Sequence, residues 1–348
     1  MAIRWTIRFV LLFLLGTVWI QACKKSNGDK SGPTPISFAI PAGFPTPQYQ
    51  FTTNALTEEG FELGRKLFYD GKLSKDGNFP CASCHQQFAA FATFDHNFSH
   101  GFNNQFTTRN APALFNLVWQ KQTHWDGGIN NLEVQPLAPL MAPNEMAEDI
   151  NSVLGKLNQD AMYKQMFKAA FGDETINSQR MLYALTQFVG SLVSADSKYD
   201  RVKKGLAAFT PQEQMGYTLF QSKCNSCHAE PLFTDNSFRN TGLPVDPTIN
   251  DRGRMRITQN RADSLKFKVP SLRNLYLTFP YGHDGRFISV NQALEHYNSG
   301  VQQSATVDPL VQHGIALSTN DKNYLQLFLR TLTDSTFIKN KRFAPPGS

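Results

Sequence analysis

Two copies of one short motif contain the residues of this 348-residue chain best suited to chemistry. The first copy is CASCH at 81–85 and the second is CNSCH at 224–228. A C-x-x-C-H segment is the attachment motif for c-type haem: two thiols bond covalently to the porphyrin vinyl groups, and the adjacent histidine becomes the proximal iron ligand. The motifs predict two covalently bound haem c groups, held by Cys81, Cys84, His85, Cys224, Cys227 and His228.

Paired cysteines have other functions that must be compared with haem attachment. A C-x-x-C pair also occurs in structural zinc sites and in disulfide exchange. A zinc site would combine both pairs as four thiolates, and neither alternative requires the histidine that follows each pair. The chain has five cysteines, so only Cys23 lies outside the two motifs. Haem attachment is therefore the interpretation that accounts for every residue of both motifs.

The first 22 residues have the layout of a secretory signal. Arg4 and Arg8 precede an apolar run at 9–20, which is shorter than a typical membrane-spanning helix. A small residue stands directly before Cys23, as in bacterial lipoprotein signals, where that cysteine becomes the lipidated first residue. We expect export to the periplasmic side, with Cys23 carrying a lipid that anchors the chain to a membrane. The alternatives are an uncleaved anchor, or an ordinary signal with an incidental cysteine.

The elements that must position the two motifs also repeat. The pattern G-x-x-L-F precedes each motif, at 64–68 and 216–220, and T-P-Q-E at 210–213 predicts a capping box that starts the second helix. About a hundred residues after each motif, apolar residues recur with the period of a helix. These residues are Leu185, Phe188, Val189 and Leu192 in the first half, and Leu325, Phe328, Leu329 and Leu332 in the second. Each half therefore predicts two helices packed across a haem, which is a cytochrome c core.

The expected fold is mainly α-helical, with two cytochrome c-like haem domains in tandem and few short strands. We predict a signal peptide at 1–22, then a lipidated N-terminus and flexible tether at 23–55, which is rich in Pro, Gly, Ser and Lys. An N-terminal haem c domain follows at 56–200, and a C-terminal haem c domain at 201–340.

Composition and charge exclude several classes of protein. Hydrophobic residues make up 41% of the chain and charged residues 18%, which excludes a largely disordered protein. The formal net charge is +6, and removal of Arg4 and Arg8 with the leader leaves about +4. No basic run follows the leader, so nucleic-acid binding is not expected. Two haems bring about four propionates, which nearly cancel the remaining excess, so the charge gives little support for an acidic partner.

Further strings connect the chain to a known family. They are GRKLFYDGKLS at 64–74, RNAPALFN at 109–116, WDGG at 125–128, a stretch from Gln135 to Glu145-Met146, FKVPSLRN at 267–274 and TFPYGHDGRF at 278–287. With both haem motifs, the chain resembles the bacterial dihaem cytochrome c peroxidases and their MauG-type relatives over about 57–333. The resemblance implies that the N-terminal haem is the peroxide site and the C-terminal haem is the electron entry site.

The resemblance also implies roles for single residues. His100 would be a displaceable distal ligand of the N-terminal haem, Trp125 the tryptophan between the two haems, and Glu145 the distal acid–base residue. A calcium ion is implied between the domains, held by Asn110 and by the backbone carbonyls of Thr278 and Pro280. The family further implies that the chain can form a homodimer.

The sixth ligand of the C-terminal haem departs from the common peroxidase pattern. That pattern has a methionine seventeen residues after the proline of the T-x-P string, and here this position is Tyr297, as in MauG-type relatives. A phenolate ligand stabilises ferric iron and should lower the haem potential relative to methionine. His296 is an alternative ligand, but adjacent helical residues point about 100° apart, so only one of the two can face the iron.

Three functions remain open from the sequence. The first is a cytochrome-c peroxidase that reduces hydrogen peroxide to water with electrons from a small donor such as a cytochrome c or a cupredoxin. Glu145 would then move a proton between the peroxide oxygens. The iron site would be closed in the resting protein if His100 binds the iron, and open if His100 is free. The second is a MauG-like enzyme that uses peroxide to oxidise a protein partner, which Tyr297 favours. The third is a dihaem electron carrier without peroxide turnover.

Overall fold

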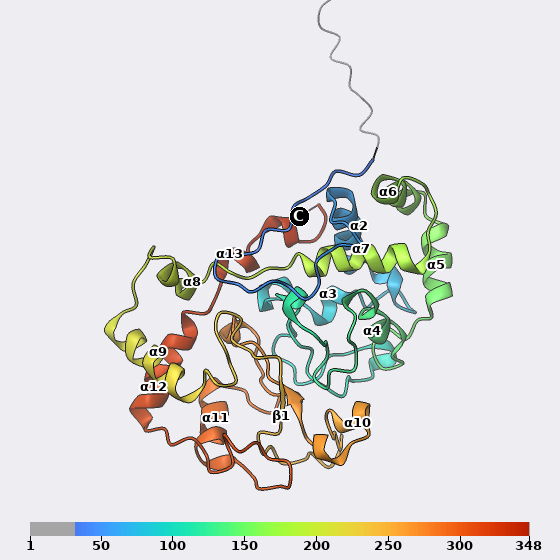
Figure 1. Ribbon diagram of the computed structural model, residues 1–348. Helices are drawn as coiled ribbons and strands as arrows, with labels where there is room; N and C mark the ends of the chain where they lie inside the picture. Colours follow the sequence, from blue (N-terminus) through green and yellow to red (C-terminus); the bar gives the residue numbers. More distant parts are fainter. Residues whose placement is uncertain (1–31, 348) are drawn as a thin grey trace, which may run out of the picture. The chain divides into compact units, whose positions relative to one another are not determined.

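Helices form most of the regular structure of the computed structural model, which describes residues 32–347 (Figure 1). The signal peptide, Cys23 and the start of the expected tether lie outside the described residues. The α-helices are α2 (Glu58–Tyr69), α3 (Cys81–Cys84), α4 (Leu137–Met141), α5 (Ile150–Asn158), α6 (Ala161–Phe171), α7 (Ser178–Gly190), α8 (Lys198–Lys203), α9 (Pro211–Lys223), α10 (Met255–Thr258), α11 (Val290–Glu295), α12 (Thr319–Arg330) and α13 (Ser335–Ile338).

Short turns and two short strands complete the regular structure. The 3-10 turns are η1 (Gly71–Leu73), η2 (Gln87–Ala89), η3 (Phe102–Asn104), η4 (Leu117–Trp119), η5 (Leu132–Val134), η6 (Arg261–Asp263), η7 (Leu275–Leu277) and η9 (Lys341–Phe343), and the π-helical turn is η8 (His296–Gly300). Strand β1 (Phe238–Arg239) pairs antiparallel with β2 (Phe267–Lys268), with Phe238 opposite Lys268. The prediction of a mainly helical fold with few short strands is confirmed.

In the N-terminal half, α2 crosses α7 at a glycine. Helix α2 begins after Thr57, whose side chain accepts a hydrogen bond from the backbone N–H of Gly60 at 3.0 Å. A Cβ atom on Gly64 would lie 1.9 Å from the carbonyl oxygen of Ala184 in α7, so only glycine permits this approach. The predicted apolar stripe of α7 is buried, and Phe188 packs directly against the glycine.

The C-terminal half repeats this crossing with α9 and α12. The predicted capping box is present, because Thr210 and Glu213 each accept a hydrogen bond from the other's backbone N–H. A Cβ atom on Gly216 would lie 2.0 Å from the carbonyl oxygen of Tyr324, and Phe328 occupies the place that Phe188 has in the first half. The two halves are thus built on the same pair of crossed helices, as the repeated G-x-x-L-F pattern predicts.

The close crossing makes Gly216 a sensitive position. The substitution Gly216→Ala is expected to lower the free energy of unfolding by about 1–3 kcal/mol, because the added methyl group must push two helices apart. The control is Gly155→Ala in α5, where a Cβ atom meets open space, and where alanine is expected to be neutral or stabilising by up to about 1 kcal/mol. Urea unfolding of both variants tests this, and equal stability would contradict the crossing.

The segment 33–55 differs from the predicted tether, because it packs on the N-terminal half. The backbone N–H groups of Gln48 and Tyr49 both donate to the carbonyl oxygen of Val118, at 2.8 and 3.0 Å. The side chain of Phe51 is buried in the N-terminal core. The tether prediction is therefore wrong from Pro33 onward, because aromatic residues between the prolines supply an apolar face that the composition of the segment conceals.

The chain passes from the N-terminal hydrophobic cluster to the C-terminal one before residue 200, where the domain boundary was predicted. Leu192 belongs to the N-terminal cluster of buried side chains, whereas Tyr199 in α8 belongs to the C-terminal cluster. The chain later returns to the first half, because Phe337 in α13 and Phe343 are buried in the N-terminal cluster. The C-terminal haem domain therefore ends before α13 in packing terms, although the prediction extended it to residue 340.

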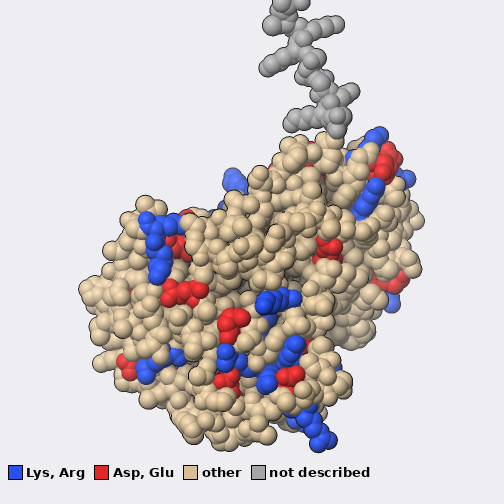
Figure 2. Space-filling view, in the orientation of Figure 1, with Lys and Arg blue, Asp and Glu red and all other residues tan. Residues whose placement is uncertain are grey.

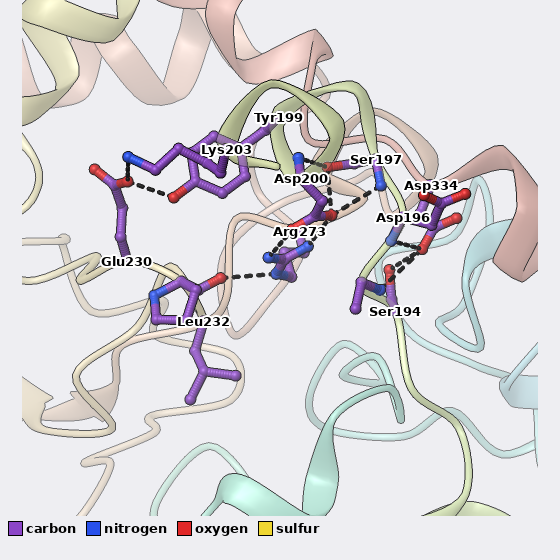
Figure 3. Close-up of polar contacts among 12 residues, drawn as sticks. Ser194, Asp196, Ser197, Tyr199, Asp200, Lys203, Glu230, Leu232, Arg273 and Asp334 are labelled. Carbon is purple, nitrogen blue, oxygen red and sulfur yellow. Dashed lines mark hydrogen bonds and ion pairs between the residues drawn. The ribbon is translucent and has the colours of Figure 1, made fainter. Parts of the chain in front are cut away.

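A buried polar network joins the two halves (Figure 3). One carboxylate oxygen of Asp334 accepts hydrogen bonds at 3.0 Å from the Ser194 hydroxyl and from the backbone N–H of Ala195. Nearby, the fully buried guanidinium of Arg273 donates to both carboxylate oxygens of Asp200, at 2.7 and 2.8 Å. Burial alone would raise the pKa of Asp200, but Arg273 more than offsets this and holds it below the ordinary value. The network fixes the connection between α7 and α8.

The surface mixes charges of both signs. On the face shown in Figure 2, basic and acidic side chains lie close together, and most of that face is neither. Within residues 32–347, no helix is both long enough and apolar enough to cross a bilayer.

Candidate haem sites

The first C-x-x-C-H motif lies on the short helix α3 and the residue after it. His85 Nδ1 lies 3.0 Å from the carbonyl oxygen of Phe91, which can only accept, so Nδ1 carries the proton. The other ring nitrogen, Nε2, has no hydrogen-bond partner among the described residues. Burial lowers the pKa of His85 to about 4, which keeps the ring neutral. A neutral imidazole whose second nitrogen is fixed by a backbone carbonyl is the form that binds iron.

The second motif repeats this arrangement at the C-terminal end of α9. His228 Nδ1 lies 3.2 Å from the carbonyl oxygen of Phe233 and 3.1 Å from that of Pro270. Burial lowers the pKa of His228 below its ordinary value. The two histidines are thus oriented by the same kind of contact, in the same tautomer.

The cysteines fit haem attachment better than the alternatives. Cys81 packs against the N-terminal core and Cys224 against the C-terminal core, so the two pairs do not meet in one zinc site. In the described part of the chain, no group of three or more His, Cys, Asp and Glu side chains could hold a metal ion. Burial raises the pKa of each of these two thiols to about 12, whereas redox-active cysteines have lowered values.

Glu145 lies beside the first motif. Burial, and to a smaller extent the negative charge of Glu145, raise the pKa of Cys84, which shows that the two side chains are close. The carboxylate of Glu145 is half-buried and makes no hydrogen bond or ion pair within the described chain, and burial raises its own pKa. Its backbone is held by the N–H of Phe102, which donates to the Glu145 carbonyl oxygen at 2.7 Å. The carboxylate is therefore free to exchange a proton.

His100 makes no hydrogen bond or ring contact with 81–85 among the described residues, although the neighbouring Ser99 lies beside Cys84. The side chain of His100 is exposed, and its ring lies 4.5 Å from that of Phe106. The next residue, Gly101, approaches the backbone of Asn144 and Glu145 so closely that a Cβ atom would lie 2.2 Å from the Asn144 carbonyl oxygen. The loop thus runs past Glu145, and the role of His100 as a displaceable ligand stays a prediction.

Trp125 lies between the two halves of the chain. Its indole N–H donates to the carbonyl oxygen of Asn110 at 2.8 Å, in the N-terminal half. Its own carbonyl oxygen accepts a hydrogen bond of 2.7 Å from the N–H of Lys268 in β2, in the C-terminal half. The first bond holds the indole and the second the backbone at the junction of the two halves, and the role of Trp125 between the haems stays a prediction.

The three residues predicted to bind calcium leave oxygen atoms available. The side-chain amide of Asn110 donates to the carbonyl oxygens of His96 and Asn97, both at 3.2 Å, so its Oδ1 is not needed for these bonds. Among the described residues, no hydrogen bond is made to the carbonyl oxygens of Thr278 and Pro280. Oxygen ligands of this kind suit calcium, and the site stays a prediction.

Tyr297 and His296 have different surroundings, and the role of Tyr297 as a haem ligand stays a prediction. Burial, followed by the nearby thiols of Cys224 and Cys227, raises the pKa of Tyr297 to about 12, which places the phenol beside the second motif. In contrast, His296 Nε2 lies 2.8 Å from the carbonyl oxygen of Thr241 and is occupied by that hydrogen bond. Both residues lie in the π-helical turn η8, a feature often found at functional sites.

A repeat within the inserts was missed by the sequence analysis. The string P-x-L-x-N occurs at 112–116 and 270–274, and an Asp-Gly pair follows each copy at the same distance, at 126–127 and 284–285. Both asparagines, Asn116 and Asn274, have left-handed φ angles, of 57° and 56°, and precede the turns η4 and η7. Aligning the two halves would have revealed this spacing, which makes Trp125 the counterpart of His283.

A second missed feature is an ion cluster that joins the halves. Arg109 donates to Asp126 at 2.5 Å and to both carboxylate oxygens of Asp251, at 2.6 and 2.9 Å. Asp251 lies far along the chain from its partner, and no sequence pattern links the two. The cluster braces the segment that carries Asn110 and Trp125 against the C-terminal half.

Comparisons with known proteins agree with this architecture. The family model described as di-haem cytochrome c peroxidase matches residues 58–208. The chain is 33% identical to methylamine utilization protein MauG of Methylorubrum extorquens, over 85% of this chain and 83% of that protein. It is 36% identical to the cytochrome c551 peroxidase of Nitrosomonas europaea, over 67% of this chain and 71% of that protein.

A solved structure extends the likeness to the whole described fold. The crystal structure of a MauG-like protein associated with microbial copper homeostasis superposes with a TM-score of 0.80 and 32% sequence identity. The alignment covers 89% of this chain and 99% of that protein. With two C-x-x-C-H motifs on a duplicated helical core, the chain belongs to the di-haem cytochrome c peroxidase family, whose members carry two haem c groups.

Proposed function

We propose that this protein is an exported peroxidase that reduces hydrogen peroxide to water with electrons from a small donor protein, such as a cytochrome c or a cupredoxin. The observation that carries the proposal is the position of Glu145 beside Cys84, with a free, half-buried carboxylate. An electron carrier has no use for a proton-exchanging group at one of its two haem motifs. Family members named as peroxidases support the same conclusion.

The haem held by Cys81, Cys84 and His85 would supply the iron at which peroxide is cleaved. In this scheme the carboxylate of Glu145 takes a proton from one peroxide oxygen and returns it to the other, which makes water the leaving group. The raised pKa of Glu145 favours this shuttle, because it makes the carboxylate a stronger base toward the peroxide proton, and an acid–base group works best when its pKa lies near the working pH. The exposed position of His100 supports a site that is open in the resting state.

The remaining residues would connect this site to the electron donor. Cys224, Cys227 and His228 would hold the second haem, with Tyr297 as its other axial ligand. Trp125 supports electron transfer between the haems, since hydrogen bonds to both halves fix its indole and backbone at the junction. Asn110, Thr278 and Pro280 would hold calcium at the same junction.

A second candidate function is a MauG-like oxidation of a protein partner by peroxide. Tyr297 favours it, because the phenol lies beside Cys224 and Cys227, where a peroxidase of the common pattern has methionine. The similarity to MauG over 85% of the chain also supports it. Membrane anchoring through Cys23, the periplasmic location and a homodimer are further parts of the proposal.

Steady-state peroxide consumption by the holoprotein distinguishes the candidates. A peroxidase consumes peroxide in proportion to the reduced cytochrome c or cupredoxin that is added. A MauG-like enzyme consumes peroxide only with its protein partner and leaves these donors reduced. A carrier exchanges electrons with the donor but does not consume peroxide.

A further inference from the structure

His124, directly before Trp125, has a buried nitrogen that nothing in the described chain satisfies. Its Nε2 is inaccessible to solvent and has no hydrogen-bond partner within residues 32–347. The residue adopts a left-handed φ of 66°, which is uncommon for a residue other than glycine. A buried polar atom without a partner costs about 1–3 kcal/mol, so such an atom normally has a ligand.

Lys268 reaches the same place from the other half of the chain. Its backbone N–H bonds to Trp125, and its ammonium group donates to the side-chain oxygen of Gln120 at 2.5 Å and to the carbonyl oxygen of Gln122 at 3.0 Å. Both acceptors are neutral, and the ammonium group has three N–H donors. One donor is therefore unused, and no carboxylate of the described chain bonds to the ammonium group, whose pKa is lowered by burial to about 7. A carboxylate beside it would favour the charged form.

The carboxylates nearby are committed elsewhere. Asp126 Oδ2 accepts from Arg109, and Asp126 Oδ1 accepts from the backbone N–H of Gly128 at 3.0 Å. Neither oxygen bonds to His124 or Lys268, although the charge of Asp126 acts on both. Both groups thus lie next to Trp125, where no carboxylate of the described residues bonds to either of them.

The position of this pair identifies the anion. Trp125, the residue after His124, donates to the carbonyl oxygen of Asn110 in the segment 109–116. The same segment reaches the first motif, because Leu114 N–H donates at 3.2 Å to the Phe91 carbonyl oxygen that also bonds His85 Nδ1. A haem attached at that motif would bring two propionates, which are carboxylates on short flexible stems. A covalently attached haem supplies these carboxylates permanently, whereas a solvent anion must be bound anew.

We propose that His124 and Lys268 form a propionate-binding site for the N-terminal haem, in which both halves of the chain hold one propionate beside Trp125. Lys268 supplies the charge and His124 donates from Nε2. The site sets the potential of this haem, because a paired propionate places less negative charge near the iron. The inference rests on haem attachment at 81–85, and it holds whichever of the proposed reactions the protein performs.

The test is spectroelectrochemical titration of the holoprotein and its variants. Lys268→Gln is expected to shift the reduction equilibrium of the N-terminal haem at least tenfold toward the ferric state. This shift lowers the midpoint potential of that haem by about 59 mV for one electron. His124→Phe is expected to shift it in the same direction. The propionate bending band in the resonance Raman spectrum should move in both variants.

Matched variants keep the result interpretable. Lys266→Gln removes the same charge two residues away, where the lysine pairs with Asp263 at 3.3 Å, and it should leave the potential and the Raman band unchanged. Lys268→Arg and His124→Gln each keep an N–H donor at the site, so both should show the propionate band of the unmodified protein. They keep the proposal testable even if Lys268→Gln and His124→Phe fold poorly. The proposal is overturned if the N-terminal haem has the same potential in Lys268→Gln and His124→Phe as in Lys266→Gln. A shift confined to the C-terminal haem would also overturn it. Peroxide turnover is measured separately, so loss of turnover alone does not affect the proposal.

Discussion

Replacing Glu145 with glutamine is expected to lower kcat for peroxide reduction by about 10²–10⁴-fold, the usual contribution of a general acid–base group. The amide has nearly the shape of the carboxylate but cannot take the peroxide proton. Because the carboxylate makes no ion pair or hydrogen bond in the described structure, the substitution should leave stability almost unchanged. Steady-state kinetics of the holoprotein measures the effect.

The pH profile of the same pair of proteins gives an independent check. The deprotonated carboxylate is the active form, so activity is lost as pH falls through the pKa of Glu145. Burial raises this pKa above the ordinary value of 4.5, so the acid limb of kcat/KM should lie above that pH and should disappear in the variant. The control Glu174→Gln makes the same change at an exposed surface ion pair and should retain both activity and the acid limb. Full activity of Glu145→Gln would remove the residue from the mechanism.

The second large effect is expected at Tyr297. The substitution Tyr297→Phe removes the only oxygen of this side chain that can bind iron, so the potential of the C-terminal haem should rise. Axial ligands set haem potentials over a range of about 0.8 V, and we expect a rise on the order of 0.1 V or more. The absorption and electron paramagnetic resonance spectra of this haem should change with it.

His296→Gln is the matched variant for this prediction. Its Nε2 is bonded to the Thr241 carbonyl oxygen, so the spectrum of the C-terminal haem should stay as in the unmodified protein. A spectrum that changes in His296→Gln and not in Tyr297→Phe would assign the ligand to His296 instead. Retention of two haems per chain in both variants excludes loss of the cofactor as the cause.

Local chemistry explains what the sequence could predict. A C-x-x-C-H motif places all its ligands within five residues, so the motif at 81–85 predicts its cofactor without knowledge of the fold. The capping box of Thr210 and Glu213 is equally local and is present as predicted. The repeated G-x-x-L-F pattern predicts the duplicated helices, and the structure adds that its glycines, Gly64 and Gly216, are where each helix pair crosses.

Contacts between distant segments explain what could not be predicted. Arg109 finds Asp251 in the other half of the chain, and neither residue has a pattern that indicates its partner. The segment 33–55 has the composition of a linker, but its aromatic side chains find apolar partners only in the folded chain. His124 had no predicted role, because an unsatisfied nitrogen becomes visible only when its surroundings are known.

The most direct test of the account is the electron stoichiometry of peroxide consumption by the holoprotein carrying two haems. Reduced cytochrome c is mixed with a limiting amount of hydrogen peroxide and the protein, and donor oxidation is followed by absorbance. We expect about two donor molecules to be oxidised for each peroxide, since peroxide needs two electrons to become water, with continued turnover on each new addition. A protein with both haems attached that leaves peroxide unconsumed, or consumes it without oxidising the donor, would contradict the proposed peroxidase.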